Sequence, residues 1–209
     1  MYRLLIKRTL DMLISIACLP ILLIALIFVG LLILLDDKGP IIYKSYRIGK
    51  NGKIFRMYKF RSMSVNAPII FNSDGSTYNA SNDYRVTKIG KVLRETSLDE
   101  LPQLLNVLKG DMSIVGPRAS LASAISTFEY DEVDKMKVRP GITGYTQAYY
   151  RNGATSREKR LKDAWYANNL TLKLDLIIIL RTFRIVVKRE GIYTKSSITT
   201  EETNSKVKV

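Results

Sequence analysis

The stretch Thr96–Arg118, TSLDELPQLLNVLKGDMSIVGPR, contains two adjacent carboxylates, Asp99 and Glu100, at the start of a predicted helix. Pro102 has no N–H group and is tolerated only in a first helical turn, so we expect a helix over about residues 98–109. At such a position the helix dipole and the free backbone N–H groups favour the ionised form of both carboxyl groups. The stretch therefore predicts a charged acidic pair at one helix end.

The residues that follow this helix, GDMSIVGPR at 110–118, combine glycines with a terminal Arg118. The glycines allow close approach of the backbone, and arginine offers a planar, permanently charged group that suits phosphate. Taken alone, Asp99 is most simply interpreted as a helix cap, because capping acids are common. A carboxylate pair beside such a run instead indicates a site for a metal ion and a phosphate.

The same stretch resembles the signature of the bacterial sugar transferases, the small monotopic polyprenyl-phosphate phosphoglycosyl transferases. With Lys7, Arg8, Asp11 and the apolar segment after them, the resemblance covers residues 1–190. One departure is Ala119, which follows the terminal arginine where the family usually has proline. Further motifs match in the same order: Tyr58–Met63 (YKFRSM), Asp83–Gly90 (DYRVTKIG) with Arg94, and Arg139–Gly144 (RPGITG).

Composition narrows the chemistry that this chain of 209 residues can perform. It has no histidine and a single cysteine, Cys18. Ser-His-Asp triads, Cys-His pairs and His-ligated zinc sites are therefore excluded, and base chemistry falls to carboxylates or lysine. One cysteine also excludes a disulfide framework. The formal net charge of +14 indicates anionic partners such as nucleotide phosphates, acidic lipid headgroups or nucleic acid.

Residues 12–35 carry no charge and could form about 36 Å of helix, enough to cross a hydrocarbon core of about 30 Å. The run is too long for a typical signal peptide and has no small-residue cleavage site after it. Pro20 removes one helical hydrogen bond and can split the segment into arms of about 8 and 15 residues. Two alternatives stay open from the residues: a kinked span, or a helix that enters the bilayer and returns.

Residues 41–48 and 53–63 are rich in β-branched and aromatic residues and are separated by an Asn-Gly turn, which predicts a β-hairpin. The hairpin carries seven Lys or Arg and no acid. Period-2 alternation places Lys59 and Arg61 on one face, where both could bind a ligand. The other cations are interpreted as a solvated surface that faces anionic headgroups.

Residues 85–94 are predicted to form a short basic helix, and its last residue, Arg94, lies five positions before Asp99 and is a candidate phosphate contact. Residues 120–136 are also predicted to be helical. Nothing in the sequence links the acids of that segment to phosphate-binding groups. They are therefore interpreted as a solvated face and not as a metal site: Glu129, Asp131, Glu132 and Asp134.

The C-terminal third contains aromatic residues and two predicted helices. Residues 145–151, YTQAYYR, could stack a nucleotide base, although packing is the simpler role for these tyrosines. Helices are predicted at 157–168 and 171–188, and the second has basic and apolar stripes. It could therefore lie in the membrane interface or dock in the protein core. Residues 191–209 are polar and predicted to be disordered.

The resemblance implies an α+β, mostly helical fold with three parts. Residues 1–38 would hold an N-terminal re-entrant membrane helix broken at Pro20, although the family usually breaks at a Ser-Pro pair and this chain has Leu19-Pro20. Residues 39–190 would form a compact cytoplasmic catalytic domain with a β-hairpin and amphipathic interfacial helices, followed by the tail 191–209. The implied location is the bacterial inner membrane, with the catalytic domain facing the cytoplasm.

The resemblance also implies a reaction: transfer of a phosphosugar from a UDP-sugar to polyprenyl phosphate, with release of UMP, as the first membrane step of glycan assembly. Asp99 is expected to be the nucleophile that forms an aspartyl-phosphosugar intermediate. Glu100 is expected to be the main Mg²⁺ ligand, with Asp99 as the second. Since two charged phosphates must meet, cationic side chains are required. The expected phosphate-binding residues are Lys59, Arg61, Arg94 and Arg118.

The expected partners are therefore a UDP-sugar, polyprenyl phosphate and the lipid bilayer, and not nucleic acid. Two other functions fit parts of the sequence. A non-enzymatic basic membrane adaptor would explain the charge and the apolar segment, but not the acidic pair within a glycine-rich run. A conventional glycosyltransferase would release UDP. The nucleotide product, which is UMP, UDP or none, separates the three.

Overall fold

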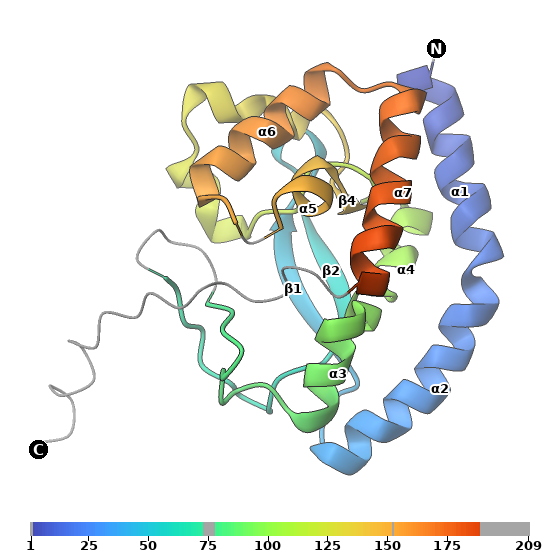
Figure 1. Ribbon diagram of the computed structural model, residues 1–209, viewed down its shortest axis with the longest axis vertical. Helices are drawn as coiled ribbons and strands as arrows, with labels where there is room; N and C mark the ends of the chain where they lie inside the picture. Colours follow the sequence, from blue (N-terminus) through green and yellow to red (C-terminus); the bar gives the residue numbers. More distant parts are fainter. Residues whose placement is uncertain (1, 73–77, 152, 189–209) are drawn as a thin grey trace, which may run out of the picture.

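The computed structural model describes residues 2–72, 78–151 and 153–188 (Figure 1). The fold is α+β and mostly helical, as predicted. Helices surround an antiparallel hairpin, and a short parallel strand pair lies beside it. The predicted division at residue 38 and the polar tail from 191 onward stay predictions, and the tail lies outside the described residues.

The predicted apolar segment forms two consecutive helices, α1 (Lys7–Ala17) and α2 (Leu19–Asp36), preceded by a π-helical turn at Tyr2–Ile6. The break lies at Cys18, two residues before Pro20, because proline fits in the first turn of a helix, where its missing N–H has no partner. Figure 1 shows a bend between the two helices. The sequence thus predicted the break correctly and its position within two residues.

Helix α2 is apolar on every side. Of the described helices, it alone is long and apolar enough to cross a membrane, by length and composition. Only 22% of this stretch is buried against the rest of the chain. The large apolar side chains that it leaves exposed include Leu23, Ile24, Ile27, Phe28, Leu31 and Leu35.

Helix α1 is held against the rest of the fold by its charged residues. Lys7 lies 2.6 Å from the carboxylate of Asp175. Arg8 donates to the carbonyl oxygens of Val107 and Leu108, at the C-terminal end of a helix whose dipole favours a cation. The Lys7, Arg8 and Asp11 motif therefore docks the N-terminal helix, since Asp11 also accepts hydrogen bonds from Ser113 and Ile114.

The predicted hairpin consists of β1 (Ile42–Ile48) and β2 (Ile54–Phe60), paired antiparallel with Tyr43 opposite Lys59. Asn51 and Gly52 both have positive φ angles, 56° and 77°, which Asn and Gly tolerate in a tight turn. Strand β2 ends at residue 60, so Arg61 lies outside it. One face of the hairpin packs on a core built around Phe55, Met57, Val107 and Met112.

The stretch that carries the acidic pair is less regular than predicted. Helix α3 is Lys88–Thr96, and α4 is Gln103–Lys109; between them lies a single 3-10 turn, Leu98–Glu100. Ser97 adopts the left-handed conformation, with φ of 59°, and separates α3 from the 3-10 turn. Gly110 ends α4 as predicted, with φ of 88°. The predicted single helix from residue 98 is therefore wrong, as is a helical position for residues 85–87.

Two glycine-containing motifs lie side by side. Strands β3 (Ser113–Val115) and β4 (Gly141–Thr143) pair in parallel, with Ser113 opposite Gly141. A Cβ atom on Gly141 would lie 2.1 Å from the backbone nitrogen of Gly116, so only glycine allows this approach. The contact joins the segment that precedes Arg118 to the segment that follows Arg139.

The segments between residues 120 and 168 lie at one end of the hairpin, and the last described helix runs beside α1 (Figure 1). The segment predicted as a helix at 120–136 forms two 3-10 helices, Ala122–Thr127 and Tyr130–Lys137. Two helices appear where they were predicted, α6 (Ser156–Asn168) and α7 (Leu172–Lys188), after a short α5 (Tyr145–Tyr149). Helix α7 buries Asp175 and Ile178 but exposes Leu176, Leu180, Phe183 and Val187.

Candidate functional site

The acidic pair lies next to two of the predicted cations. Lys59 Nζ is 2.5 Å from Glu100 Oε1 and 3.5 Å from Asp99 Oδ2. Arg118 reaches Glu100 from the other motif, at 3.6 Å from the same Oε1. The 3-10 turn of the pair packs on β2, which explains why Lys59 meets both carboxylates. The structure thus brings together four of the predicted site residues from three separate segments.

The two carboxyl groups differ in their protonation behaviour. Burial raises the pKa of Asp99, and this effect outweighs the positive charge of Lys59. The pKa of Glu100 is well below its usual range, because Lys59 and Arg118 outweigh the effect of burial. The expectation that the helix end favours the ionised form of both groups is wrong for Asp99: the pair lies in a buried 3-10 turn, where desolvation dominates.

A hollow opens beside the pair. Glu100, Lys59 and Arg118 lie on its wall, whereas Asp99 does not line it, although the Asp99 side chain keeps 12% of its surface exposed. A ligand in the hollow would thus contact cations and one ionised carboxylate. The residues that line it are Arg47, Met57, Lys59, Glu100, Gln103, Met112, Arg118, Ala119 and Gly141.

The backbone of Arg118 is held from two sides by residues that sequence reasoning missed. Its N–H donates to Asp163 at 3.0 Å, and its carbonyl accepts from Lys135 at 3.0 Å. Lys135 and Asp163 are both buried and lie 3.4 Å apart. Alanine in place of the family's proline at position 119 therefore does not leave this backbone unsupported. The sequence did contain a signal that Asp163 is buried: it lies beside Ala164 and Ala167 on one face of a predicted helix.

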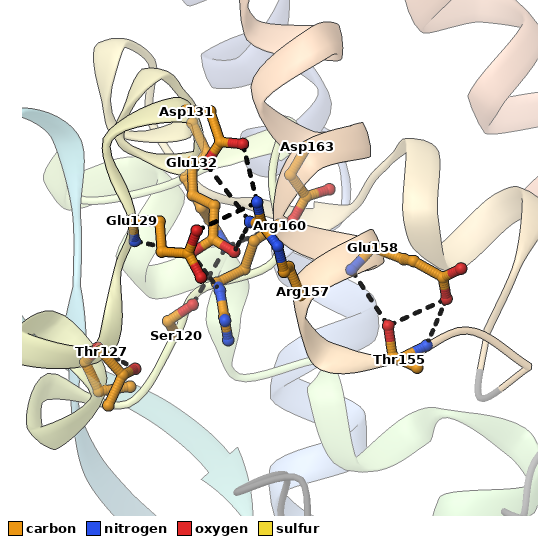
Figure 2. Close-up of polar contacts among 12 residues, drawn as sticks. Ser120, Thr127, Glu129, Asp131, Glu132, Thr155, Arg157, Glu158, Arg160 and Asp163 are labelled. Atoms are coloured by element: carbon orange, nitrogen blue, oxygen red, sulfur yellow. Dashed lines mark hydrogen bonds and ion pairs between the residues drawn. The ribbon is translucent and has the colours of Figure 1, made fainter.

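An ionic cluster joins the 3-10 helix at 130–137, which also carries Lys135, to α6 (Figure 2). Glu132 has a fully buried side chain and lies 3.2 Å from Arg157 and 2.7 Å from Arg160. Hydrogen bonds from Arg160, from the Glu129 N–H and from Arg157 hold its pKa below the usual range despite burial. The prediction of a solvated acidic face is therefore wrong for Glu132.

Two other predicted phosphate contacts have protein partners. Arg61 bonds to the side chain and carbonyl oxygen of Asp37 and to the carbonyl of Pro40, so it secures the end of α2. The predicted convergence of Arg61 with Lys59 is wrong, because β2 ends before Arg61. Arg94 donates to Ser62 and Asn79, and its positive charge also acts on Asp99. Arg94 thus borders the site, whereas Arg61 serves the fold.

The aromatic run at 145–151 has a packing role in the structure. Tyr145 stacks on Tyr149, with ring centroids 4.6 Å apart, and contacts Trp165. The guanidinium of Arg181 lies 4.0 Å from the centroid of the Tyr149 ring and donates to the carbonyl of Ala148. These rings therefore join α5, α6 and α7 to one another.

The donor atoms of the site suit a hard metal ion that keeps most of its water. In the described parts of the chain, no group of three or more Asp, Glu or Cys side chains gathers into a metal cage. Mg²⁺ does not require one, because it commonly binds through one or two carboxylates and substrate phosphates. Glu100 is ionised and lines the hollow, so its chemistry fits this mode.

Comparison with known proteins agrees with the motifs. The model of the bacterial sugar transferase family matches residues 2–189. The chain is 39% identical over 200 residues to the undecaprenyl-phosphate galactose phosphotransferase of Salmonella typhimurium, covering 90% of this chain and 42% of that protein. It is 37% identical over 192 residues to the UDP-N-acetylgalactosamine-undecaprenyl-phosphate N-acetylgalactosaminephosphotransferase of Aeromonas hydrophila, covering 89% of this chain and 44% of that protein.

The chain thus spans less than half the length of these two relatives. It matches the uncharacterized sugar transferase EpsL of Bacillus subtilis over 94% of both chains, at 37% identity. The acidic pair, its lysine and the two glycine motifs lie within the matched region in each case. From the family match and the relatives together, the chain belongs to the bacterial sugar transferase family.

Proposed function

We propose that the protein is a phosphoglycosyl transferase that moves a phosphosugar from a UDP-sugar to polyprenyl phosphate and releases UMP. The observation that carries the proposal is the Asp99–Glu100 pair beside Lys59 and Arg118, since Glu100 and both cations line a hollow. The names of the two phosphotransferase relatives, which specify undecaprenyl phosphate and a hexose or N-acetylhexosamine, support the substrate class.

The reaction would proceed in two displacements at phosphorus. An Asp99 carboxylate oxygen attacks the phosphorus that bears the sugar, the bond to the bridging oxygen of the diphosphate breaks, and UMP leaves. A phosphate oxygen of polyprenyl phosphate then attacks the same phosphorus, the bond to Asp99 breaks, and polyprenyl-diphosphate-sugar forms. Splitting the transfer in this way means that the two anionic substrates need not react directly with each other.

The cations stabilise the negative charge that gathers in both steps. Lys59 already contacts both carboxylates, so its flexible side chain can turn from Glu100 towards a bound phosphate. Arg118 lies at the hollow with a side chain that is 55% exposed, and its backbone is held by Asp163 and Lys135. Arg94, which acts on Asp99 through its charge, has the weakest case as a phosphate contact.

Identification of the nucleotide product tests the proposal. Full-length protein in membranes, incubated with polyprenyl phosphate and a UDP-sugar labelled on its uracil ring, is expected to yield UMP. Release of UDP would assign a conventional glycosyltransferase, and no nucleotide turnover with any UDP-hexose or UDP-N-acetylhexosamine would favour the basic membrane adaptor. Either result contradicts the proposal.

Glu100 would hold Mg²⁺, which neutralises phosphate charge when it is bound. We expect activity to require Mg²⁺. Glu100→Gln should raise the Mg²⁺ concentration that gives half-maximal activity by about tenfold, since a neutral amide is a poorer ligand for a hard cation. Mg²⁺ titrations of initial rate measure this, with exposed Glu129→Gln as the control. Full activity in excess chelator would exclude the metal, and an unchanged Mg²⁺ dependence would assign the ligand role to another group.

We further propose that the protein is monotopic in the bacterial inner membrane, with both ends of the chain in the cytoplasm. Support comes from the bend at Cys18 and from the exposed apolar surface of α2. In addition, both ends of the α1–α2 segment are anchored to the rest of the fold. Lys7 pairs with Asp175 at one end, and Asp36 accepts a hydrogen bond from Ile89 at the other. The apolar stripe of α7 would lie in the interface beside it.

Topology can be measured with single cysteines in a Cys18→Ser background. We expect Arg3→Cys and Ser205→Cys to be protected from a membrane-impermeant thiol reagent in intact cells and labelled after lysis. Pro20→Leu restores a helical hydrogen bond and favours spanning, so it should expose the residue 205 site to the reagent. Labelling of that site from outside in the protein with Pro20 intact would contradict the topology and remove access to cytoplasmic UDP-sugar.

A further inference from the structure

Arg47 is a cation of the hollow that the sequence does not single out. In the hairpin register, Arg47 is opposite Phe55, and it shares its face of β1 with Tyr43, the partner of Lys59. Both cations therefore project from the same face of the hairpin, and both line the hollow together with Glu100 and Arg118.

The contacts of Arg47 leave its charge without a counter-ion. Its Nε donates to Ser45 Oγ at 3.1 Å and its NH1 to the carbonyl of Ala119 at 3.3 Å, and both acceptors are neutral. No carboxylate oxygen of the described residues lies within 4.0 Å of its guanidinium nitrogens. By contrast, each buried lysine or arginine of the described residues has such a partner: Lys7, Arg61, Arg85 and Lys135.

This arrangement is unfavourable without a ligand. Burial, together with the positive charge of Arg118, lowers the pKa of Arg47 to about 10, and the opposing effects of Tyr43 and Glu100 are too small to offset this shift. Two guanidinium groups that repel each other at the edge of one hollow are stabilised by an anion that contacts both. Arginine suits phosphate in particular, since its planar group can donate two parallel hydrogen bonds.

We propose that Arg47 binds the nucleoside-side phosphate of the UDP-sugar, the phosphate that leaves in UMP. This rests on the proposed function. The phosphate that bears the sugar must approach Asp99 and thus Lys59, and the second phosphate of the diphosphate then needs a cation that no carboxylate neutralises. Arg47 meets this requirement. The phosphate of polyprenyl phosphate has the same chemistry, so the experiment must separate the two sources.

Binding of UMP to the full-length protein in detergent, measured by calorimetry, tests the assignment. We expect Arg47→Gln to weaken UMP binding by about 10- to 100-fold and Arg47→Lys to have a smaller effect. The KM for polyprenyl phosphate should stay within about twofold of the wild type. The matched control is Arg56→Gln, on the outer face of the same hairpin, where Arg56 bonds to Tyr46 and does not line the hollow.

A second variant separates phosphate binding from a purely structural role. Ser45→Ala removes the hydrogen bond to Arg47 Nε and keeps the charge, so it should bind UMP nearly as well as wild type. Equal losses of UMP affinity in Ser45→Ala and Arg47→Gln would mean that packing, and not phosphate binding, is responsible. Wild-type UMP affinity in Arg47→Gln would also overturn the assignment. So would an Arg47→Gln variant in which only the KM for polyprenyl phosphate is raised. Each of these outcomes contradicts only the role of Arg47, because the wild type would still release UMP. A wild type that forms no UMP would contradict the proposed function itself.

Discussion

Asp99→Asn is expected to lower turnover by at least about a thousandfold and to leave the fold intact, because the amide is nearly isosteric but cannot act as a nucleophile. Burial raises the pKa of this carboxyl group, so the protein gains no stability from its charge at this position. The unfolding midpoint of the variant should therefore equal that of wild type or lie slightly above it. Rates of UMP release and thermal unfolding of the same preparations measure the two effects.

The covalent step gives this prediction a direct readout. Wild type mixed with UDP-sugar and no lipid acceptor should gain the mass of one phosphosugar on the peptide that contains Asp99, and Asp99→Asn should gain none. Asp111→Asn, a change of the same kind twelve residues along the same stretch, is the control and should keep near wild-type activity. Wild-type turnover in Asp99→Asn, or an adduct on another residue, would remove Asp99 from the nucleophile's role.

Glu132→Gln is expected to lower the free energy of unfolding by about 2–4 kcal/mol, because it leaves Arg157 and Arg160 without the buried charge that they share. Arg157 is 43% exposed, so water offsets part of the loss. Urea titration of the detergent-solubilised chain measures the change. The folded-state pKa of Glu132 is lowered, so its contribution should be present at neutral pH and lost as the pH falls below about 4.3, the ordinary value for glutamate.

Glu129→Gln is the matched control for this prediction. Glu129 contacts the same Arg157 at 3.1 Å, but its side chain is 62% exposed, so its loss should change the free energy of unfolding by less than about 1 kcal/mol. Equal effects of the two substitutions would show that burial of Glu132 is not what matters. Because the 3-10 helix at 130–137 also carries Lys135, which holds the Arg118 carbonyl, Glu132→Gln should reduce activity as well as stability.

Much of the fold could be predicted from local patterns. The Asn-Gly turn between β-rich segments predicted the hairpin, and periodic apolar residues predicted α6 and α7 to within two residues of their observed bounds. A charge-free segment with one proline predicted two apolar helices and a break. These features depend on residues close together in the chain, where turn chemistry and helical hydrogen bonding decide the outcome.

The site was predicted in part. The signature stretch and YKFRSM box named Asp99, Glu100, Lys59 and Arg118, which the structure brings together. Alternation along β2 also grouped Arg61 with Lys59, whereas Arg61 lies beyond the end of the strand and pairs with Asp37. The period-2 rule holds only while the strand lasts, and β2 ends at Phe60.

The sequence by itself determined which chemistry is available: carboxylates and cations act, since there is no histidine and no cysteine beyond the apolar segment. It also determined the hairpin, the helices and the family. Only the tertiary structure decided the environment of each charge, as Glu132, Asp163 and Lys135 became buried partners and Asp99 acquired a raised pKa. The physical reason is that desolvation and ion pairing depend on groups distant in sequence, which no local pattern specifies.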